Sequence, residues 1–211
     1  MPHKLPRGLY ALLDDSVRAE LPMIEKARAV IDAGVGVLQL RLEQTTDRVA
    51  LPLIREVVAL AAPRGVKVIV NDRVDLALAG RASGVHLGAD DLPVDVARRL
   101  LGPEALIGAT TRTLEDIERA RALGADHVGL GPIFQTSTKV VGHAPMGLEQ
   151  FARIASRSPI PVVGIAGITL ATIGQVALAG AWAAAVAGDL LNADDVVSRA
   201  RALQGAFSAP R

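Results

Sequence analysis

The stretch Lys67-Val-Ile-Val-Asn-Asp72 and the two runs that follow it, Gly84-Val-His-Leu-Gly88 and Leu106-Ile-Gly-Ala-Thr110, decide the fold. Each is a short run of β-branched and other apolar residues, and a longer segment of helical period separates it from the next. Nearly continuous apolar strands that alternate with helices are typical of a parallel sheet covered by helices. This part of the chain therefore predicts repeated strand–helix units.

The same alternation continues in both directions and gives eight strand–helix units. The other predicted strands are Gly8–Asp14, Val35–Arg41, His127–Ile133, Pro161–Gly167 and Trp182–Gly188. Eight units in a chain of 211 residues predict one domain, residues 1–211, folded as an α/β protein with a single (β/α)8 TIM barrel. The alternative is an open doubly wound sheet, which usually has a glycine-rich turn after its first strand. Leu13-Asp-Asp-Ser16 is not such a turn.

One predicted helix carries its own start signal. Between Thr113 and Leu123, apolar residues recur at helical spacing. Thr113 and Asp116 stand three residues apart at the beginning of this segment and fit a capping box, in which each side chain bonds the backbone N–H of the other residue. The helix is therefore expected to begin beside Thr113.

Composition narrows the class of protein. Half of the residues are apolar but only 2% are aromatic, so the core is expected to consist of Ala, Val, Leu and Ile. The net charge of +1 and the absence of long runs of one sign predict neither a nucleic-acid nor a membrane partner. The chain has no cysteine, which excludes disulfides, thiolate catalysis and Cys-based zinc sites. With no signal-peptide pattern and no long apolar run, we expect a soluble cytoplasmic protein, and a homo-oligomer is compatible with the sequence.

Residues at the carboxyl ends of barrel strands form the active site in proteins of this fold. The second predicted strand ends in Gln39-Leu-Arg41, and the strand period of two places Gln39 and Arg41 on the same side. A barrel interior rarely holds a guanidinium group, so an anionic ligand would explain Arg41. The alternative is a structural salt bridge, for example to Glu43.

Two carboxylates follow the next two strands. Asp72 comes directly after Asn71 at the end of the third strand, and Asp91 lies in the loop after the fourth. Carboxylates from adjacent loops suit Mg²⁺, which keeps several waters and also binds phosphate oxygens of a substrate. Taken singly, Asn71 and Asp72 are also compatible with a turn, and Asp91 with the N-cap of a helix that has Pro93 in its first turn.

The remaining strand ends offer anion-binding groups. Thr110 supplies a hydroxyl group, unless it only caps the next helix. The long connection from Phe134 to Pro145 contains Thr136-Ser-Thr-Lys139, which suits phosphate recognition, although a solvated polar loop has a similar composition. The last two strands end in small residues, which let backbone N–H groups approach a phosphate, as is usual after strands seven and eight of a barrel. These small residues are Gly167, Ala187 and Gly188.

Together these residues resemble the thiamine phosphate synthase (thiamine-phosphate pyrophosphorylase) family, from Leu9 to Asp195. The most specific stretches are Asn71–Ala79, Gly84–Gly88, Asp91-Leu-Pro93, Gly131–Phe134 and Thr136–Lys139. The resemblance implies a Mg²⁺-dependent transferase of thiamine biosynthesis. Such an enzyme condenses hydroxymethylpyrimidine pyrophosphate with thiazole phosphate, or with its carboxylated precursor. The products are thiamine phosphate and pyrophosphate, with CO₂ as well from the carboxylated precursor.

The resemblance also implies roles for residues of this chain. Asp72 and Asp91 would hold Mg²⁺, and Arg41, Thr110 and Lys139 form the expected catalytic set. We expect His86, Glu43 and Ser137 to belong to the substrate-binding residues. Contacts to the pyrimidine pyrophosphate would come from Gln39, Arg41, Asn71, Thr110 and Lys139. The thiazole phosphate site would consist of Thr136, Thr138, Gly167, Ala187 and Gly188.

Some positions depart from the family pattern. Glu43 stands where the family usually has a lysine, and Gly188 where it usually has a serine. Asp189 adds a negative charge beside the expected phosphate. These departures are compatible with weaker phosphate binding, with compensation by Arg73 or Arg112, or with a paralogue that has changed its task.

Two other functions stay open on the sequence. A thiazole tautomerase is a related barrel, but its histidine would fall near Arg112, so this chain would lack the base. A non-catalytic barrel that binds phosphorylated ligands would tolerate Glu43 and Asp189. The joint presence of Asp72, Asp91 and Lys139 speaks against that alternative.

Overall fold

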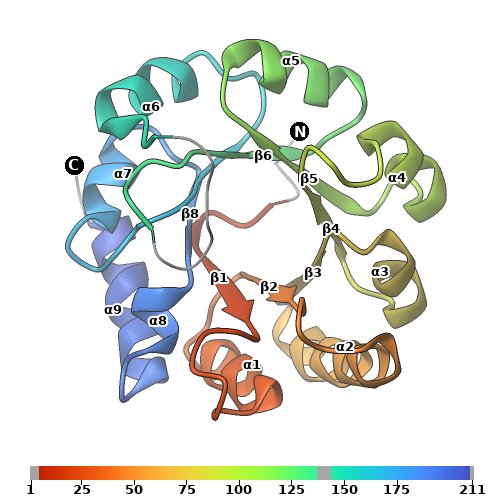
Figure 1. The fold of residues 1–211 in the computed structure, drawn as a ribbon. Coiled ribbons are helices and arrows are strands. Elements are labelled where there is room, and N and C mark those ends of the chain that lie inside the picture. The colour runs from red at the N-terminus through yellow and green to blue at the C-terminus, as the bar shows by residue number, and fades with distance from the viewer. Residues whose placement is uncertain (1–4, 137–143, 210–211) are drawn as a thin grey trace.

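The computed structural model describes residues 5–136 and 144–209, and its eight parallel strands pair in chain order until β8 pairs with β1 and closes a barrel. Figure 1 shows the strands around the centre and the helices outside them. The predicted (β/α)8 TIM barrel is therefore confirmed. The strands are β1 (Gly8–Asp14), β2 (Val37–Arg41), β3 (Lys67–Asn71), β4 (Gly84–Leu87), β5 (Leu106–Thr111), β6 (His127–Leu130), β7 (Val162–Gly164) and β8 (Ala183–Val186).

The helices fill the connections between strands, and α5 begins as the sequence predicts. The Thr113 side chain accepts a hydrogen bond from the backbone N–H of Asp116, whose own side chain accepts one from the backbone of Thr113. The helical elements are α1 (Met23–Asp32), α2 (Asp47–Ala61), the short 3₁₀ helix η1 (Ala62–Arg64), α3 (Val74–Gly80), α4 (Val94–Leu101), α5 (Leu114–Ala122), α6 (Gly147–Ala155), α7 (Ile173–Leu178), α8 (Gly188–Leu191) and α9 (Val196–Ser208). Within the described ranges, none of these helices is long and apolar enough to cross a membrane.

The alternation of side chains along β2 divides the core into two layers. Leu38 and Leu40 are fully buried in the large cluster that packs the barrel against its helices. Val37 belongs to a second, smaller cluster of buried residues. Because side chains of a strand alternate between its two faces, Gln39 and Arg41 lie on the face of Val37. This is the arrangement that the period of two predicts.

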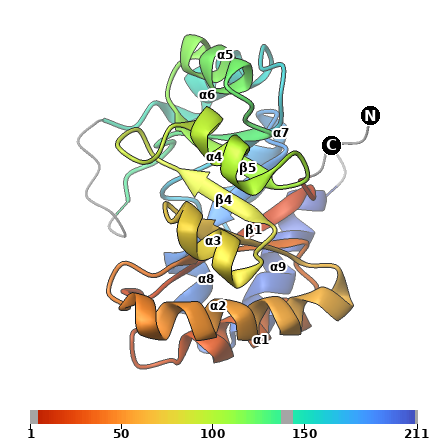
Figure 2. The same cartoon turned by 90° about the vertical axis from the view of Figure 1, so that its right-hand side faces the viewer.

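The smaller cluster closes the barrel at the amino ends of the strands. Its members are Leu5, Tyr10, Val37, Ile69, Leu106, Val163 and Ala183. The indole N–H of Trp182 donates to the carbonyl oxygen of Leu5 over 2.9 Å, which ties the chain before β1 to this floor. In Figure 2 the arrowhead of β4 points to the left, so the carboxyl ends of the strands and the loops after them lie on that side.

Several predicted strands end earlier than expected. The strand predicted to reach Gly167 stops at Gly164, because Ala166 and Gly167 have φ values of 71° and 68° and turn the chain away. The strand expected to include Asp72 stops at Asn71 for the same reason, since Asp72 has a φ of 61°.

The strands predicted to end at Ile133 and Gly188 stop at Leu130 and Val186. In the first, Pro132 has no N–H for the sheet, and in the second, Gly188 already begins α8. The other predicted bounds either match the observed ones, as for β1, or differ by one or two residues.

Candidate active site

A cavity of about 1150 Å³ opens at the carboxyl ends of the strands. It gathers side chains from almost every strand end, as the sequence predicts. Glu43 and Asp72 do not line it, and Ser137, Thr138 and Lys139 lie outside the described residues. The expected site residues that do line it are Gln39, Arg41, Asn71, His86, Asp91, Thr110, Thr136, Gly167, Ala187 and Gly188.

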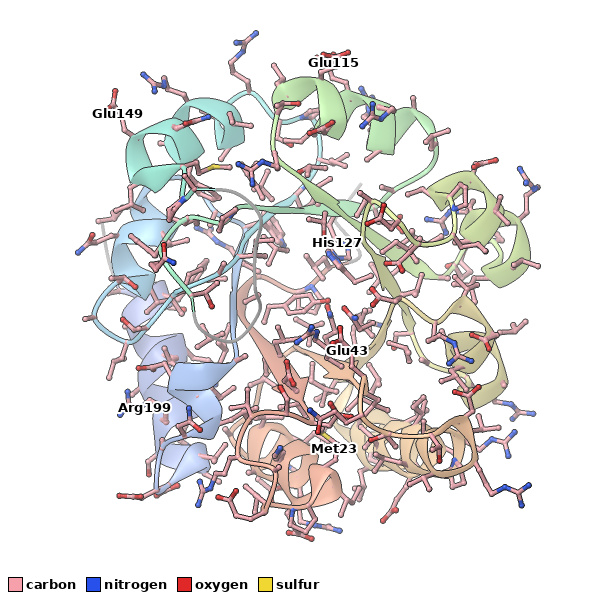
Figure 3. All side chains as sticks on the ribbon, viewed as in Figure 1. Met23, Glu43, Glu115, His127, Glu149 and Arg199 are labelled. Carbon is pink, nitrogen blue, oxygen red and sulfur yellow. The ribbon has the colours of Figure 1, made fainter. Side chains whose placement is uncertain are left out.

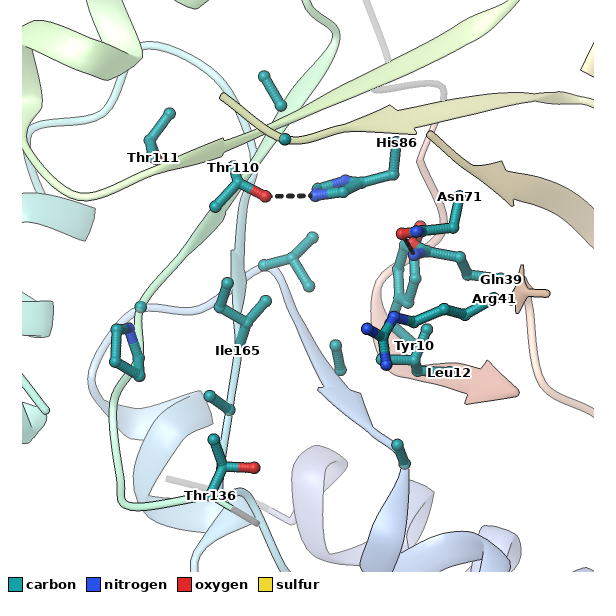
Figure 4. Close-up of a pocket in the computed structure, with 18 of the residues that line it drawn as sticks. Tyr10, Leu12, Gln39, Arg41, Asn71, His86, Thr110, Thr111, Thr136 and Ile165 are labelled. Atoms are coloured by element: carbon teal, nitrogen blue, oxygen red, sulfur yellow. Dashed lines mark hydrogen bonds between the residues drawn. The ribbon is translucent and has the colours of Figure 1, made fainter. Parts of the chain in front are cut away.

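A chain of hydrogen bonds fixes the amides on one wall. The Tyr10 hydroxyl group donates to Gln39 Oε1 over 2.7 Å, and Gln39 Nε2 donates to Asn71 Oδ1 over 2.7 Å. Figure 4 shows Gln39 and Asn71 side by side with Tyr10 beneath them. Because Asn71 Oδ1 accepts from Gln39, its amide nitrogen is left as a donor toward the cavity.

A second polar pair comes from β4 and β5. His86 Nε2 lies 3.0 Å from the Thr110 hydroxyl oxygen, and Figure 4 draws this hydrogen bond across the upper part of the cavity. The alternative that Thr110 caps a helix is wrong, because Thr113 is the residue that caps α5. The imidazole and the hydroxyl group are thus held together on the wall next to Asn71, since β3 pairs with β4 and β4 with β5.

His127 is a buried residue that sequence reasoning missed. Its side chain points from β6 toward the barrel centre, as Figure 3 shows, and is fully buried. Neither ring nitrogen has a hydrogen-bond partner within the described part of the chain. Burial, with a smaller contribution from His86, lowers the pKa of His127 to about 3, so the ring is neutral at ordinary pH. A histidine at the start of a strand gives no sequence signal of such burial.

Arg41 reaches the cavity wall between two carboxylates. It makes an ion pair with Asp14, and its Nη2 atom lies 2.6 Å from Glu43 Oε1. Asp14 is buried, whereas half of the Glu43 side chain is exposed. Burial opposes ionisation of Asp14, but hydrogen bonds from Ser16 and Arg41 outweigh it and lower the pKa of this carboxyl group. Arg41 thus forms the structural salt bridge to Glu43 that the sequence offered as the alternative, and it also lines the cavity.

The two expected metal carboxylates are in different surroundings. Asp91 lines the cavity, and its Oδ2 atom accepts a hydrogen bond of 2.6 Å from the backbone N–H of Gly88. It does not cap α4, because Pro93 is the N-cap residue. Asp72 begins the turn after β3, and its own N–H donates to the carbonyl oxygen of His86 over 2.8 Å.

The donor set fits magnesium better than a metal that needs many protein ligands. Within residues 5–136 and 144–209, no group of three or more His, Cys, Asp or Glu side chains is close enough to hold a metal ion. Mg²⁺ is usually bound by one or two carboxylates, with water and substrate phosphate oxygens completing its shell. Asp91 in the cavity, together with Asp72 after the neighbouring strand, offers oxygen ligands of that kind.

The opposite wall carries the small residues expected at a phosphate. Gly167 has a φ of 68°, and a Cβ there would overlap the carbonyl oxygen of Gln135, so only glycine fits. The sequence places the negative charge of Asp189 beside the expected phosphate, and in the structure Arg199 neutralises that charge. The two carboxylate oxygens of Asp189 each lie 3.1 Å from Nη1 of Arg199, and Oδ2 also accepts from the N–H of Leu170.

The closed eight-stranded barrel and its polar cavity define the class of protein: a (β/α)8 barrel with its site at the carboxyl ends of the strands. The sequence pattern of the family described as "Thiamine monophosphate synthase" matches residues 9–190. The chain belongs to this family, as the resemblance predicted.

Similar proteins agree with that assignment over nearly their whole length. The thiamine-phosphate synthase of Myxococcus xanthus (strain DK1622) is 50% identical over 210 residues, which cover 100% of this chain and 96% of that protein. That of Anaeromyxobacter dehalogenans (strain 2CP-C) is 48% identical, covering 97% and 89%. The solved thiamine phosphate pyrophosphorylase from Pyrococcus furiosus superposes with a TM-score of 0.85 at 31% identity and covers 95% of each chain.

The family is one of transferases that condense a pyrimidine pyrophosphate with a thiazole phosphate in thiamine biosynthesis. The predicted function and enzyme class are confirmed at this level.

Proposed function

We propose that this chain is a Mg²⁺-dependent thiamine phosphate synthase. In the reaction the bond from the pyrimidine methylene carbon to the pyrophosphate oxygen breaks, and a bond from that carbon to the thiazole nitrogen forms. The observation that supports the proposal most strongly is that one cavity combines fixed amides for a heterocycle with the cation Arg41 and the carboxylate Asp91.

The amide wall is suited to orienting the pyrimidine. Gln39 is bonded at both ends of its amide, by Tyr10 and Asn71, so it is pre-organised and gives up little conformational freedom on binding. Asn71 then presents a donor, and the pair of His86 and Thr110 presents further donor and acceptor groups. Fixed orientation of two reactants is a large part of catalysis when the chemistry needs no strong base.

The leaving pyrophosphate would lie on the side of Arg41 and Asp91. Arg41 is the expected catalytic cation, and Asp14 holds its guanidinium in place. Asp91 and Asp72 would hold Mg²⁺, which, when bound, neutralises the negative charge of the departing pyrophosphate. Glu43 engages Arg41 at the mouth and would have to share or release it when an anion binds.

The thiazole phosphate would lie against the small residues of the opposite wall. Gly167, Ala187 and Gly188 allow close approach to the backbone, and Thr136 adds a hydroxyl group at the same cavity. Thr138, Ser137 and Lys139 belong to this proposal on their sequence alone. We also propose a cytoplasmic location and a single domain, which the closure of all eight strands into one barrel supports.

The experiment is to incubate the purified chain with both substrates and Mg²⁺ and to measure thiamine phosphate and pyrophosphate. Equal amounts of both products are expected. Isomerisation of the thiazole precursor without any pyrimidine substrate would instead indicate a tautomerase. Binding of both substrates without turnover would indicate a non-catalytic barrel, and either outcome would overturn the proposal.

A further inference from the structure

The arginines that line the cavity differ in whether a carboxylate already engages them. Arg41 is paired with two carboxylates, those of Asp14 and Glu43. Of the other lining arginines, Arg119 lies 2.8 Å from Asp116 and Arg199 lies 3.1 Å from Asp189. The fourth is Arg112.

Arg112 is the exception among these four. Its guanidinium group makes no hydrogen bond or ion pair within the part of the chain that the structure describes, although the residue is half-buried. The segment 137–143 contains no acidic residue that could pair with it. A cation at the wall of a cavity with no protein carboxylate to neutralise it is available to an anionic ligand.

Arg73, the other arginine considered for such a role, is excluded by its contacts. It bonds Asp47 over 2.6 and 2.8 Å and Asp75 over 2.6 and 2.9 Å, and it does not line the cavity. This network occupies its donors on the outside of the barrel mouth. Compensation for Glu43 therefore cannot come from Arg73.

Arg112 directly follows β5, and a hydrogen bond holds its backbone in place. Thr111 is buried, its hydroxyl group donates to the carbonyl oxygen of Gly129 over 3.3 Å, and it lines the cavity as Thr110 does. Arg112 follows directly, and its backbone N–H donates to Asp116 Oδ2 over 3.1 Å. Thr110, near the end of β5, and Arg112, just after it, both line the cavity. Figure 4 shows Thr110 and Arg41 on different sides of the cavity.

We propose that Arg112 binds the pyrophosphate group of the pyrimidine substrate, from the side opposite to Arg41. The inference rests on the proposed function for the identity of the substrate. The assignment to the pyrophosphate group follows from the position of Arg112 in the barrel. Arg112 lies after β5, and the neighbouring strand β4 leads into the loop that carries Asp91. A planar guanidinium group can donate two parallel hydrogen bonds to phosphate oxygens, and that of Arg112 is not shared with a carboxylate as that of Arg41 is.

The test compares Arg112→Gln with Arg121→Gln. Arg121 lies on α5, is exposed, does not line the cavity and carries the same charge, so its variant controls for long-range electrostatics. Calorimetry with Mg²⁺ and inorganic pyrophosphate measures binding without turnover. We expect the Kd for pyrophosphate to rise about tenfold or more in Arg112→Gln, to recover partly in Arg112→Lys, and to stay unchanged in Arg121→Gln.

Steady-state kinetics then assign the subsite. The KM for the pyrimidine pyrophosphate should rise in Arg112→Gln, and the KM for the thiazole phosphate should not. A normal pyrophosphate Kd in Arg112→Gln, or a rise confined to the thiazole phosphate KM, would overturn the inference. If the parent chain makes no thiamine phosphate, the proposed function fails. If Arg112→Gln then still loses pyrophosphate binding and Arg121→Gln does not, Arg112 remains a ligand of the anion.

Discussion

The imidazole rings of His86 and His127 lie with their centroids 6.0 Å apart and their planes tilted by 38°. Gly108, on the strand between them, makes this approach possible. A Cβ at position 108 would lie 2.5 Å from His86 Nδ1 and closer still to His127 Nε2. The absence of one side chain thus lets a cavity histidine and a buried histidine lie one beside the other.

Gly108→Ala should therefore damage both stability and the site. Because both rings would have to move, we expect a loss of about 1–3 kcal/mol in the free energy of unfolding, as for overpacked cores. Displacement of His86 from Thr110 should also lower kcat/KM. Urea unfolding and kinetics measure the two effects.

Gly205→Ala is the matched control for that change. Gly205 lies inside α9, and a Cβ there would meet nothing within 4 Å. This variant should be stabilised by about 0.5–1 kcal/mol, because alanine favours a helix over glycine. Equal effects of the two variants would contradict the steric role of Gly108.

The burial of His127 predicts a pH dependence of stability. Its pKa is about 3 in the folded chain and about 6.5 when unfolded, so above pH 6.5 neither state binds the proton. As pH falls from 6.5 toward 3, only the unfolded chain gains it. The free energy of unfolding should then fall by about 1.4 kcal/mol per pH unit. Urea unfolding measures the free energy of unfolding of the parent chain and of His127→Leu between pH 7.5 and 5. The value for the parent chain minus the value for the variant should decrease as the pH falls. A constant value of this difference would show that His127 does not titrate in this way.

Asp14 and Glu43 should contribute very unequally to stability, although both engage Arg41. Removing the charge of buried Asp14 leaves Arg41 without its main partner, so Asp14→Asn should cost roughly 3 kcal/mol. Glu43 is half exposed, and Glu43→Gln should cost less than about 1 kcal/mol. Chemical denaturation of both variants at pH 7 measures this, and similar losses would mean that Asp14 is not the main anchor of Arg41.

Glu43→Lys should strengthen pyrophosphate binding. The change releases Nη2 of Arg41 and adds a second cation at the mouth, so we expect the Kd for Mg²⁺-pyrophosphate to fall several-fold. Glu104→Lys makes the same charge change at an exposed position away from the cavity and serves as the control. Equal effects of the two substitutions would show that Glu43 acts only through net charge.

Much of the architecture was predictable because it depends on local periodicity. The period of two correctly placed Gln39 and Arg41 on the inner face, and the spacing of Thr113 and Asp116 correctly predicted a helix start. The premature end of β7 was not predictable, since the left-handed conformation of Ala166 is rare for a residue with a Cβ.

The charges of the site were harder to predict than its fold. Asp189 is neutralised by Arg199 from α9, ten residues away, and that pairing depends on how α8 and α9 pack. Asp14 and Asp15 are adjacent in sequence, yet only the side chain of Asp14 turns inward to hold Arg41. Sequence identifies such residues as candidates, whereas tertiary packing decides which charge meets which.

Thiamine phosphate formation, measured with and without Mg²⁺ for the parent chain, Asp72→Asn and Asp91→Asn, tests the central claim most directly. The account predicts that the parent chain forms thiamine phosphate and pyrophosphate in equal amounts, stops when a chelator is added and resumes with excess Mg²⁺. Both variants should stay folded by thermal melting and lose most turnover. Turnover that survives chelation, or folded variants with parental activity, would contradict the proposed metal site, and a parent chain that forms no thiamine phosphate would contradict the proposed function itself.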